Sequence, residues 1–186
     1  VLAFHPHDGT HRRRVVVPVR RQVYSGCTLA SDTKPWLASR PVMQHHHVSV
    51  EDDADFNRLF RFLMGQAIGF VAAGGGGYGP AHTGIIKAFR ERGVTFDIVG
   101  GTSVVASLMA GVAMMRTPEE IDEDTRDIFI TSRSFKRRTL PRYSFLDHTA
   151  LDDALCRATK GADIEDAWLP YFAVASDLSA TAPYIF

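Results

Sequence analysis

One serine and a run of glycines are the residues of this sequence whose types and spacing could support catalysis. Five glycines and Tyr78 make up the segment Gly74–Gly79, and Gly101-Thr102-Ser103 follows further along the chain. Glycines can leave successive backbone N–H groups free to point at an anion, either a bound phosphate or a transient oxyanion. A serine held at a sharp turn between a strand and a helix exposes its hydroxyl to a substrate. Ser103 therefore has two interpretations, a nucleophile or merely the N-cap of the next helix.

The sequence around both segments predicts alternating strands and helices. The apolar run Ile68–Ala73 has the length of a buried parallel strand, and Phe96–Val99 predicts a second one. A helix is expected between Pro80 and the stop signal Gly93. The helix Val104–Met115 is apolar nearly all round and should be buried. This order is typical of an α/β fold with a parallel sheet.

Neighbouring parallel strands would bring the glycine segment and the serine turn to the same edge of the sheet. The amides of Gly74–Gly79 would then lie next to Ser103. An oxyanion hole would flank a nucleophile, which is the arrangement that acyl transfer requires. The two segments together are much more specific for this chemistry than either is alone.

Weaker signals predict the remaining helices and strands. A short helix carrying Trp36 should begin at a cap within Ser31–Thr33, and the acidic run Glu51–Asp55 should stabilise the start of another helix. Thr117 should cap a helix that begins at Pro118. Other strands and helices are expected at Val1–Phe4, Arg14–Val19, Phe56–Met64, Thr149–Thr159 and Tyr171–Ser176.

Composition excludes several classes of function. With 186 residues and 45% hydrophobic content the chain can form a real core. Its 21 basic residues balance 21 acidic ones, so nothing in the net charge calls for a nucleic acid partner. The longest nearly uncharged stretch, Gly65–Ile86, is broken by glycines and predicts no transmembrane helix. Cys27 and Cys156 fit no metal or redox spacing, and we expect a reducing, cytoplasmic location.

The glycine segment also fits a second kind of ligand site, which we disfavour. Gly74, Gly76 and Gly79 also fit a dinucleotide-binding loop, with Asp97 as its downstream acidic residue. Asp97, however, is followed by Ile98-Val99 and then by the turn at Ser103, so it does not end the second strand. The dinucleotide interpretation is therefore a minor alternative.

The histidine cluster His45–His47 invites a metal interpretation. Adjacent histidines on an extended segment point to opposite sides, so at most His45 and His47 could share an ion. No carboxylate at helical spacing completes such a site. We expect structural histidines, no metal and no cofactor.

The residues quoted so far resemble those of the patatin-like phospholipases, and within that family the bacterial relatives of neuropathy target esterase. Arg58–Ala113 carries the resemblance, with the glycine segment, Ala81–Phe89 and Asp97–Ser103 as its motifs. Outside it, two further parts of the chain resemble the segment before the family's catalytic domain and a later part of that domain. They are Pro35–Pro41 with His45–His47, and Asp163–Asp166 with Trp168–Phe172.

The resemblance implies a three-layer α/β fold with a mainly parallel sheet and a serine lipolytic hydrolase. Residues 1–64 would be a pre-catalytic segment, the tail of an upstream region, and residues 65–186 the N-terminal part of the catalytic domain, with its C-terminal part missing. Ser103 would be the nucleophile of a Ser-Asp dyad that uses no histidine. The amides of Gly75, Gly76 and Gly77 would be the oxyanion donors. Lipid or lysophospholipid esters would be the substrates.

Three positions depart from the family's pattern. Tyr78 stands where the family carries arginine, and Val105 replaces the last glycine of G-x-S-x-G, where its branched side chain is expected to distort the turn. The family's Asp-Gly-Gly or Asp-Gly-Ala motif does not follow Ser103, so its aspartate would lie beyond the chain end. These departures leave an alternative open, a catalytically incompetent remnant of the fold or a binding module.

Other carboxylates and a basic loop complete the candidates. Asp147, Asp153 and Asp177 could replace the missing base, but a helix cap or a solvated loop accounts better for each. The basic loop Arg133–Arg142 suits either contact with anionic lipid headgroups or plain solvation. Peripheral contact with a membrane is one of these two interpretations, and both stay open. The residues indicate no oligomeric state.

Overall fold

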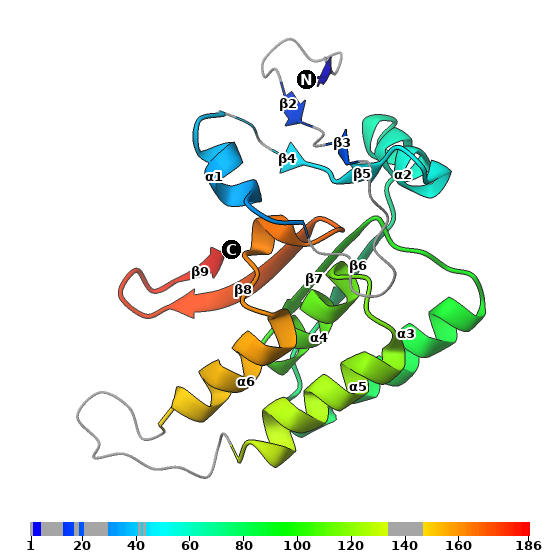
Figure 1. Ribbon diagram of the computed structural model, residues 1–186. Helices are drawn as coiled ribbons and strands as arrows, with labels where there is room; N and C mark the ends of the chain where they lie inside the picture. The colour runs from blue at the N-terminus through cyan, green and yellow to red at the C-terminus, as the bar shows by residue number, and fades with distance from the viewer. Residues whose placement is uncertain are drawn as a thin grey trace.

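A four-stranded sheet forms the centre of the computed structural model, which describes residues 2–4, 13–16, 19–20, 30–40, 42, 44–133 and 147–186 (Figure 1). Its strand order is β6-β7-β8-β9. The first three strands are parallel and the last is antiparallel to its neighbour: β6 (Gly69–Ala72), β7 (Ile98–Thr102), β8 (Tyr171–Asp177) and β9 (Ala182–Ile185). Ala72 pairs with Gly101, so β6 and β7 end at the same edge.

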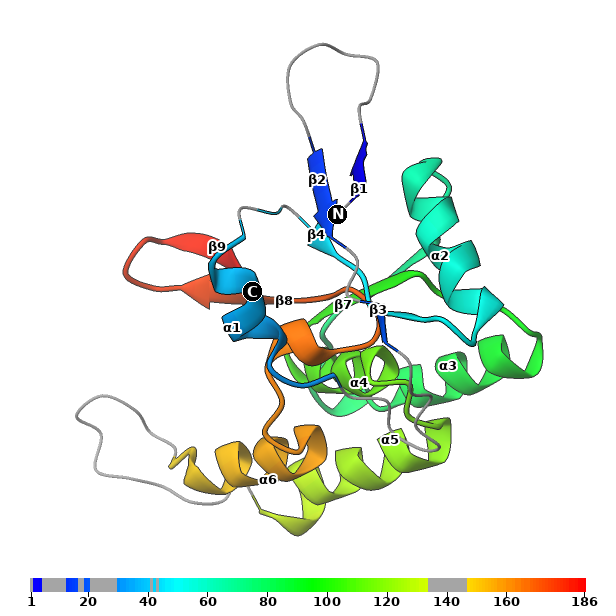
Figure 2. The same cartoon turned by 45° about the horizontal axis from the view of Figure 1, so that its top comes forward.

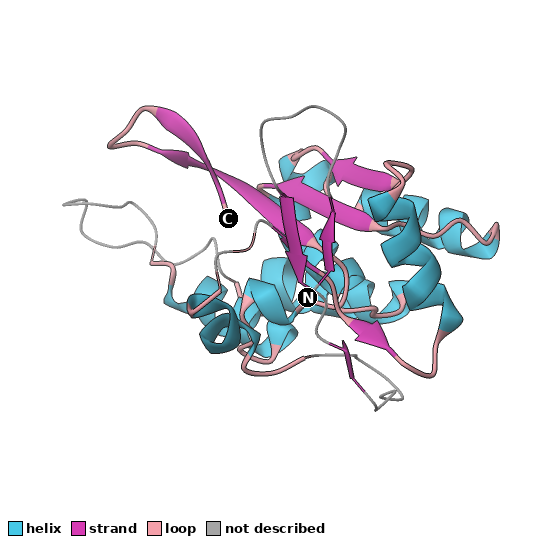
Figure 3. Cartoon of the chain, turned by 90° about the horizontal axis from the view of Figure 1, so that it is seen from above, coloured by secondary structure: helices cyan, strands magenta, loops and turns pink. Residues whose placement is uncertain are grey.

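Helices α3 and α4 pack on one face of this sheet, and α5 packs against both of these helices. Figure 3 shows helices lying against the strands of the sheet. The most buried of them is α4, as its apolar sequence predicts, and it packs against β7. The core joins Ile86, Leu108 and Ile121 to the strand residue Val99. The helices span α3 (Ala81–Glu91), α4 (Val104–Ala113), α5 (Pro118–Arg126) and α6 (Thr149–Thr159), with the π-helical turn η2 (Asp127–Thr131) between the last two in sequence.

Local signals fixed the ends of several helices correctly. Gly93 follows α3 with a φ of 69°, a conformation that favours glycine. Thr117 and Glu120 form a complete capping box at the start of α5, in which each side chain accepts a hydrogen bond from the other residue's amide. The bounds of α6 agree with the prediction.

The N-terminal region forms small elements above the sheet. Its short strands pair as β1-β2-β4 and β3-β5, and in Figure 2 the strands β1, β2 and β4 lie toward the top, away from α5 and α6. The predicted early strands are confirmed, although the second ends at Val16. The elements are β1 (Leu2–Phe4), β2 (Arg13–Val16), β3 (Val19–Arg20), α1 (Thr33–Ala38), β4 (Gln44–His45), β5 (Val48–Ser49) and α2 (Asp53–Leu63).

Three predictions about these elements were wrong in part. β6 is an edge strand whose second face is open, since Val71 is 64% exposed, because an apolar run does not reveal how many faces are covered. α2 begins at Asp53, so the acidic run lies within its first turn and Asp52 provides the cap. Asp32, at the N-cap of α1, has a left-handed backbone and its side chain caps nothing.

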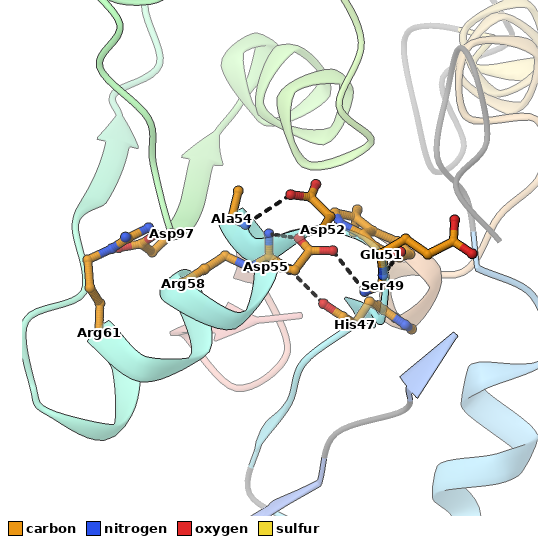
Figure 4. Close-up of polar contacts among 10 residues, drawn as sticks. His47, Ser49, Glu51, Asp52, Ala54, Asp55, Arg58, Arg61 and Asp97 are labelled. Atoms are coloured by element: carbon orange, nitrogen blue, oxygen red, sulfur yellow. Dashed lines mark hydrogen bonds and ion pairs between the residues drawn. The ribbon is translucent and has the colours of Figure 1, made fainter. Parts of the chain in front are cut away.

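A buried ion pair lies within α2 (Figure 4), and a hydrogen bond to its carboxylate joins α2 to the segment before β8. The Asp55 carboxylate pairs with Arg58 at 2.5 Å and accepts hydrogen bonds from the Ser49 amide (2.9 Å) and the Trp168 indole N–H (3.0 Å). Arg58 in turn donates to the His47 carbonyl oxygen at 2.6 Å. Every hydrogen bond to Asp55 offsets part of the cost of burying its charge.

The division of the chain into a pre-catalytic segment, residues 1–64, and the start of a catalytic domain, residues 65–186, stays a prediction.

His46 is the one member of the histidine run that is buried without a hydrogen bond in the described part of the chain. It is 1% exposed, neither ring nitrogen has a partner there, and its ring lies 4.4 Å from that of Phe62 between centroids. Burial, and then the positive charge of Arg58, lower the pKa of His46 to about 4. His46 is therefore neutral in the folded chain at pH 7.

The substitution Asp55→Asn should lower the free energy of unfolding by about 3 kcal/mol, because it leaves Arg58 buried without a counter-charge. Urea denaturation at pH 7 measures this. The control is Asp53→Asn, an exposed carboxylate in the same helical turn, which should cost about 0.5 kcal/mol. Equal losses in the two variants would contradict the role of the ion pair.

His46 should make the fold sensitive to mild acid. The unfolded chain takes up a proton at this histidine near pH 6.5 and the folded chain only near pH 4, so stability falls as the pH drops through that window. The full loss is about 3 kcal/mol. In His46→Leu this part of the loss should vanish, with no loss of stability at pH 7. Urea titrations of the parent and the variant at pH 7, 5.5 and 4 measure the free energy of unfolding at each pH. Parallel curves of this free energy against pH for the two proteins would refute the role of His46.

Candidate active site

Ser103 occupies a sharp turn between β7 and α4. Its φ of 58° and ψ of −141° place it in a backbone region that residues with a Cβ rarely adopt. Although Ser103 stands at the N-cap position of α4, its side chain makes no capping hydrogen bond. The capping interpretation therefore does not explain the strained backbone of this exposed residue.

The glycine segment lies directly against Ser103, as parallel pairing of β6 and β7 predicts. An ideal Cβ added to Gly74 would lie 2.8 Å from the Cβ of Ser103 and 3.2 Å from the carbonyl oxygen of Thr102. A Cβ contact of 2.8 Å essentially never occurs in proteins, so a side chain at position 74 would force the loop or Ser103 to shift. The two segments that the sequence singles out are thus in contact.

The turn η1 (Gly76–Tyr78) leaves part of the glycine segment free to bind an anion. Its hydrogen bonds use the amides of Tyr78, which donates to Gly75 at 3.0 Å, and Gly79, which donates to Gly76 at 2.9 Å. Among the described residues, the amides of Gly75, Gly76 and Gly77 donate to no other group. These are the three amides expected to be oxyanion donors, and all three residues are exposed.

Val105 does not distort the turn, contrary to expectation. It is fully buried, and Ser103 before it keeps the strained backbone of such a turn. The space comes from Gly79, where an added Cβ would collide with the Val104 side chain and lie 3.3 Å from a methyl carbon of Val105. Glycine is required on the facing segment instead of at position 105.

Ser103 opens on an apolar cavity of about 500 Å³ between α4 and α6, a volume typical of small-molecule sites. Nearly all of its wall is hydrocarbon. α4 contributes Val104, Ala106, Ser107, Ala110 and Met114, α6 contributes Leu151, Leu155 and Thr159, and Phe129, Ala162, Asp163, Ile164, Ala167 and Tyr171 complete it. Such a lining suits a hydrocarbon chain better than a polar ligand.

Sequence reasoning missed this cavity and the residue that ties it to the sheet. The Tyr171 hydroxyl donates to the Ala106 carbonyl oxygen at 2.8 Å, and burial raises the pKa of Tyr171 to about 12. The signal that was available is the spacing of Leu151, Leu155 and Thr159, which places them on one side of α6.

No carboxylate of the described residues accepts a hydrogen bond from Ser103. Asp147 accepts from the amide and hydroxyl of Thr149 at 3.0 and 2.6 Å, and Asp177 accepts from two turn amides at 2.8 and 3.0 Å. Asp153 is exposed on α6. The capping and loop interpretations of Asp147 and Asp177 are therefore confirmed.

The dinucleotide interpretation is excluded by the position of Asp97. This carboxylate is buried just before β7, at the end opposite to the glycine segment. Arg61 binds it through two nitrogens at 2.8 and 2.5 Å, and the Ile68 amide donates to it at 2.8 Å. Burial alone would raise the pKa of Asp97, but these hydrogen bonds lower it below the usual range. Its oxygens are not available to a ribose.

The histidines have structural contacts, as expected. His45 and His47 both place Nε2 2.9 Å from the carbonyl oxygen of Glu165, and each must donate because a carbonyl only accepts. Within the described ranges, no three His, Cys, Asp or Glu side chains are grouped to hold a metal ion. Cys27 and residues 134–142 of the basic loop lie outside the described residues.

Comparison with known proteins identifies the family. The profile of the family described as "Patatin-like phospholipase" matches residues 70–182. "Patatin-like phospholipase domain-containing protein 7" of Rattus norvegicus is 37% identical over 133 residues, which is 69% of this chain and 10% of the relative. "Patatin-like phospholipase domain-containing protein 6" of Homo sapiens is 36% identical with the same coverage. "Neuropathy target esterase sws" of Drosophila persimilis is 29% identical over 181 residues, 81% of this chain and 13% of the relative. The chain thus spans about a tenth of the length of these relatives.

The contact between Gly74 and Ser103 predicts a position-specific cost within one loop. Gly74→Ala should lower the free energy of unfolding by about 1–3 kcal/mol, because its methyl group forces the loop away from Ser103. Gly77→Ala is the matched control, since nothing lies within 4 Å of its added Cβ, and it should change stability by less than about 0.5 kcal/mol. Thermal and urea unfolding measure both, and a neutral Gly74→Ala would show that the contact is not tight.

Proposed function

Because the chain belongs to the patatin-like phospholipase family, we propose that it hydrolyses the acyl ester bond of a lipid with Ser103 as nucleophile. The observation that carries this proposal is the contact between the strained Ser103 turn and the glycine segment, beside an apolar cavity. Each feature has a plain structural explanation alone. Their meeting at one hydroxyl is what acyl transfer needs.

The reaction would proceed through an acyl-enzyme. Ser103 Oγ attacks the ester carbonyl carbon while its proton passes to a carboxylate base, and the carbonyl oxygen becomes an oxyanion. The ester C–O bond then breaks and the leaving alcohol takes the proton. Water, activated by the same base, attacks the acyl-serine, releases the fatty acid and restores the hydroxyl.

The oxyanion would be stabilised by backbone amides instead of side chains. Gly75, Gly76 and Gly77 offer N–H groups that no other described residue uses. Donors fixed in the fold before the reaction need no reorganisation when negative charge develops, and one such donor is worth roughly 10²–10³ in rate.

The base of the proposed Ser-Asp dyad must be a carboxylate that the described residues do not bring to Ser103. Asp147 and Asp177 are already held by helix and turn amides, and Asp97 by Arg61. The missing base supports the alternative that the chain is a catalytically incompetent remnant or a binding module of the same fold. Reactivity of the serine decides between the two.

The substrate class follows from the cavity. Its hydrocarbon lining suits the acyl chain of a lysophospholipid or phospholipid, with the ester placed at Ser103. Esters of this kind reside in membranes or micelles, so peripheral contact with a lipid surface is part of the proposal. Tyr78, 88% exposed on the glycine segment, is an amphipathic ring of the type found at such interfaces. No described helix is both long enough and apolar enough to cross a bilayer.

Labelling with a fluorophosphonate probe tests the proposal, because such probes react with activated serines. We expect the parent of this test, a version extended through the residues that follow Phe186 in the reading frame, to be labelled. Mass spectrometry should place the phosphonyl group on Ser103, and Ser103→Ala in the same extended version should reduce labelling to background. Ser179→Ala, in an exposed turn between β8 and β9, is the control and should label like the parent.

Failure of the parent to react, with the fold intact by circular dichroism, would favour the remnant or binding-module alternative. Labelling that persists in Ser103→Ala would identify another nucleophile and overturn the assignment.

A further inference from the structure

One side of α4 forms a continuous wall of the cavity. Ser103, Ala106, Ala110 and Met114 follow one another at intervals of three or four residues, so they lie in one row along the helix. The row begins at the exposed serine and ends at Met114, which is 4% exposed. Between its two ends, only methyl groups and the small Ser107 side chain face the space.

The end of the row at Met114 is closed by contacts between helices. Arg116, just beyond α4, donates to the Ala158 carbonyl oxygen of α6 at 2.8 Å and pairs with Asp124 of α5 at 2.9 Å. These bonds fasten three helices together beside Met114, and Figure 1 shows α4, α5 and α6 converging. The exposed end of the row at Ser103 is its mouth, and the buried end at Met114 is its bottom.

The distance between the mouth and the bottom of the row sets the length of the acyl chain that fits. Eleven residues separate Ser103 from Met114, which corresponds to roughly 16 Å at about 1.5 Å per residue. An extended alkyl chain with carbon–carbon bonds of about 1.5 Å advances by roughly 1.25 Å per bond. The row thus matches an acyl chain of about 12 carbons.

We propose that α4 acts as a ruler for the acyl chain, with Met114 setting the longest chain that fits and Ala110 keeping the middle of the cavity open. This inference rests on the proposed function for the placement of the ester at Ser103. Ala110 and Met114 are then specificity-determining residues. The occupant is a single unbranched hydrocarbon chain, since the row is lined by small side chains along its whole length.

The test measures binding of saturated fatty acids of 6 to 18 carbons, below their micellar concentrations, by displacement of a fluorescent dodecanoic acid analogue. Affinity should rise about fourfold per added methylene up to about 12 carbons and then level off. Ala110→Leu should move this break to chains about four carbons shorter. Met114→Ala should move it to chains about three carbons longer.

Two controls separate this proposal from the proposed hydrolysis. Met115→Ala alters a neighbouring methionine that is 45% exposed and outside the row, and its break should stay at about 12 carbons. Ser103→Ala should keep both binding and break, because binding does not need the nucleophile. A break found without fluorophosphonate labelling would support the ruler and refute the hydrolase.

The ruler would be overturned by any of three results. They are affinity that keeps rising to 18 carbons, absence of saturable binding by the parent chain, and a break that stays in place in the variants. If Ala110→Leu fails to fold by circular dichroism, Met114→Ala decides alone, since it removes atoms from the cavity wall and adds none.

Discussion

The structure depends on a close approach of two backbones at Ser103. Gly74 and Gly79 lack the side chains that would otherwise collide with Ser103 and Val104, so the loop after β6 can lie on the first turn of α4. Gly101 extends the constraint to the strand, because a Cβ there would lie 2.9 Å from the Val105 carbonyl oxygen. Three glycines on two segments thus allow one serine to be strained, exposed and flanked by free amides.

The N-terminal region supports the cavity although none of its described residues lines it. His45 and His47 donate to the Glu165 carbonyl oxygen, and the Thr33 amide donates to the Asp166 carboxylate at 3.1 Å. Asp55 holds Trp168 through its indole N–H. All of these bonds end on the turn η3 (Ile164–Asp166) and the residues after it, where Ile164 and Ala167 form part of the cavity wall. The two histidines, the Thr33 amide and Asp55 of α2 therefore act on the site through the position of this wall.

Much of the fold and of the site could be predicted from local sequence patterns, whereas the features that depend on packing between distant residues could not. Apolar runs and capping residues located β6, α4, α5 and α6, and parallel pairing explained why the glycine segment meets Ser103. The exposed face of β6, the partners of the histidines and the cavity depend on residues far apart in sequence, such as His45 and Glu165. The expected effect of Val105 was wrong because the compensating glycine stands on another segment. Periodicity within one element carries no information about its partners.

Two costly features meet at one hydroxyl, and stability alone explains neither. A positive φ at Ser103 costs of order 1–3 kcal/mol. An apolar cavity costs the contacts that larger side chains would make, and Ala106 and Ala110 are the positions where such side chains could grow. A chain shaped only for stability would place glycine at position 103 and fill the space beside α4. Strain and empty volume next to each other are expected where a fold is shaped around a ligand and a reaction.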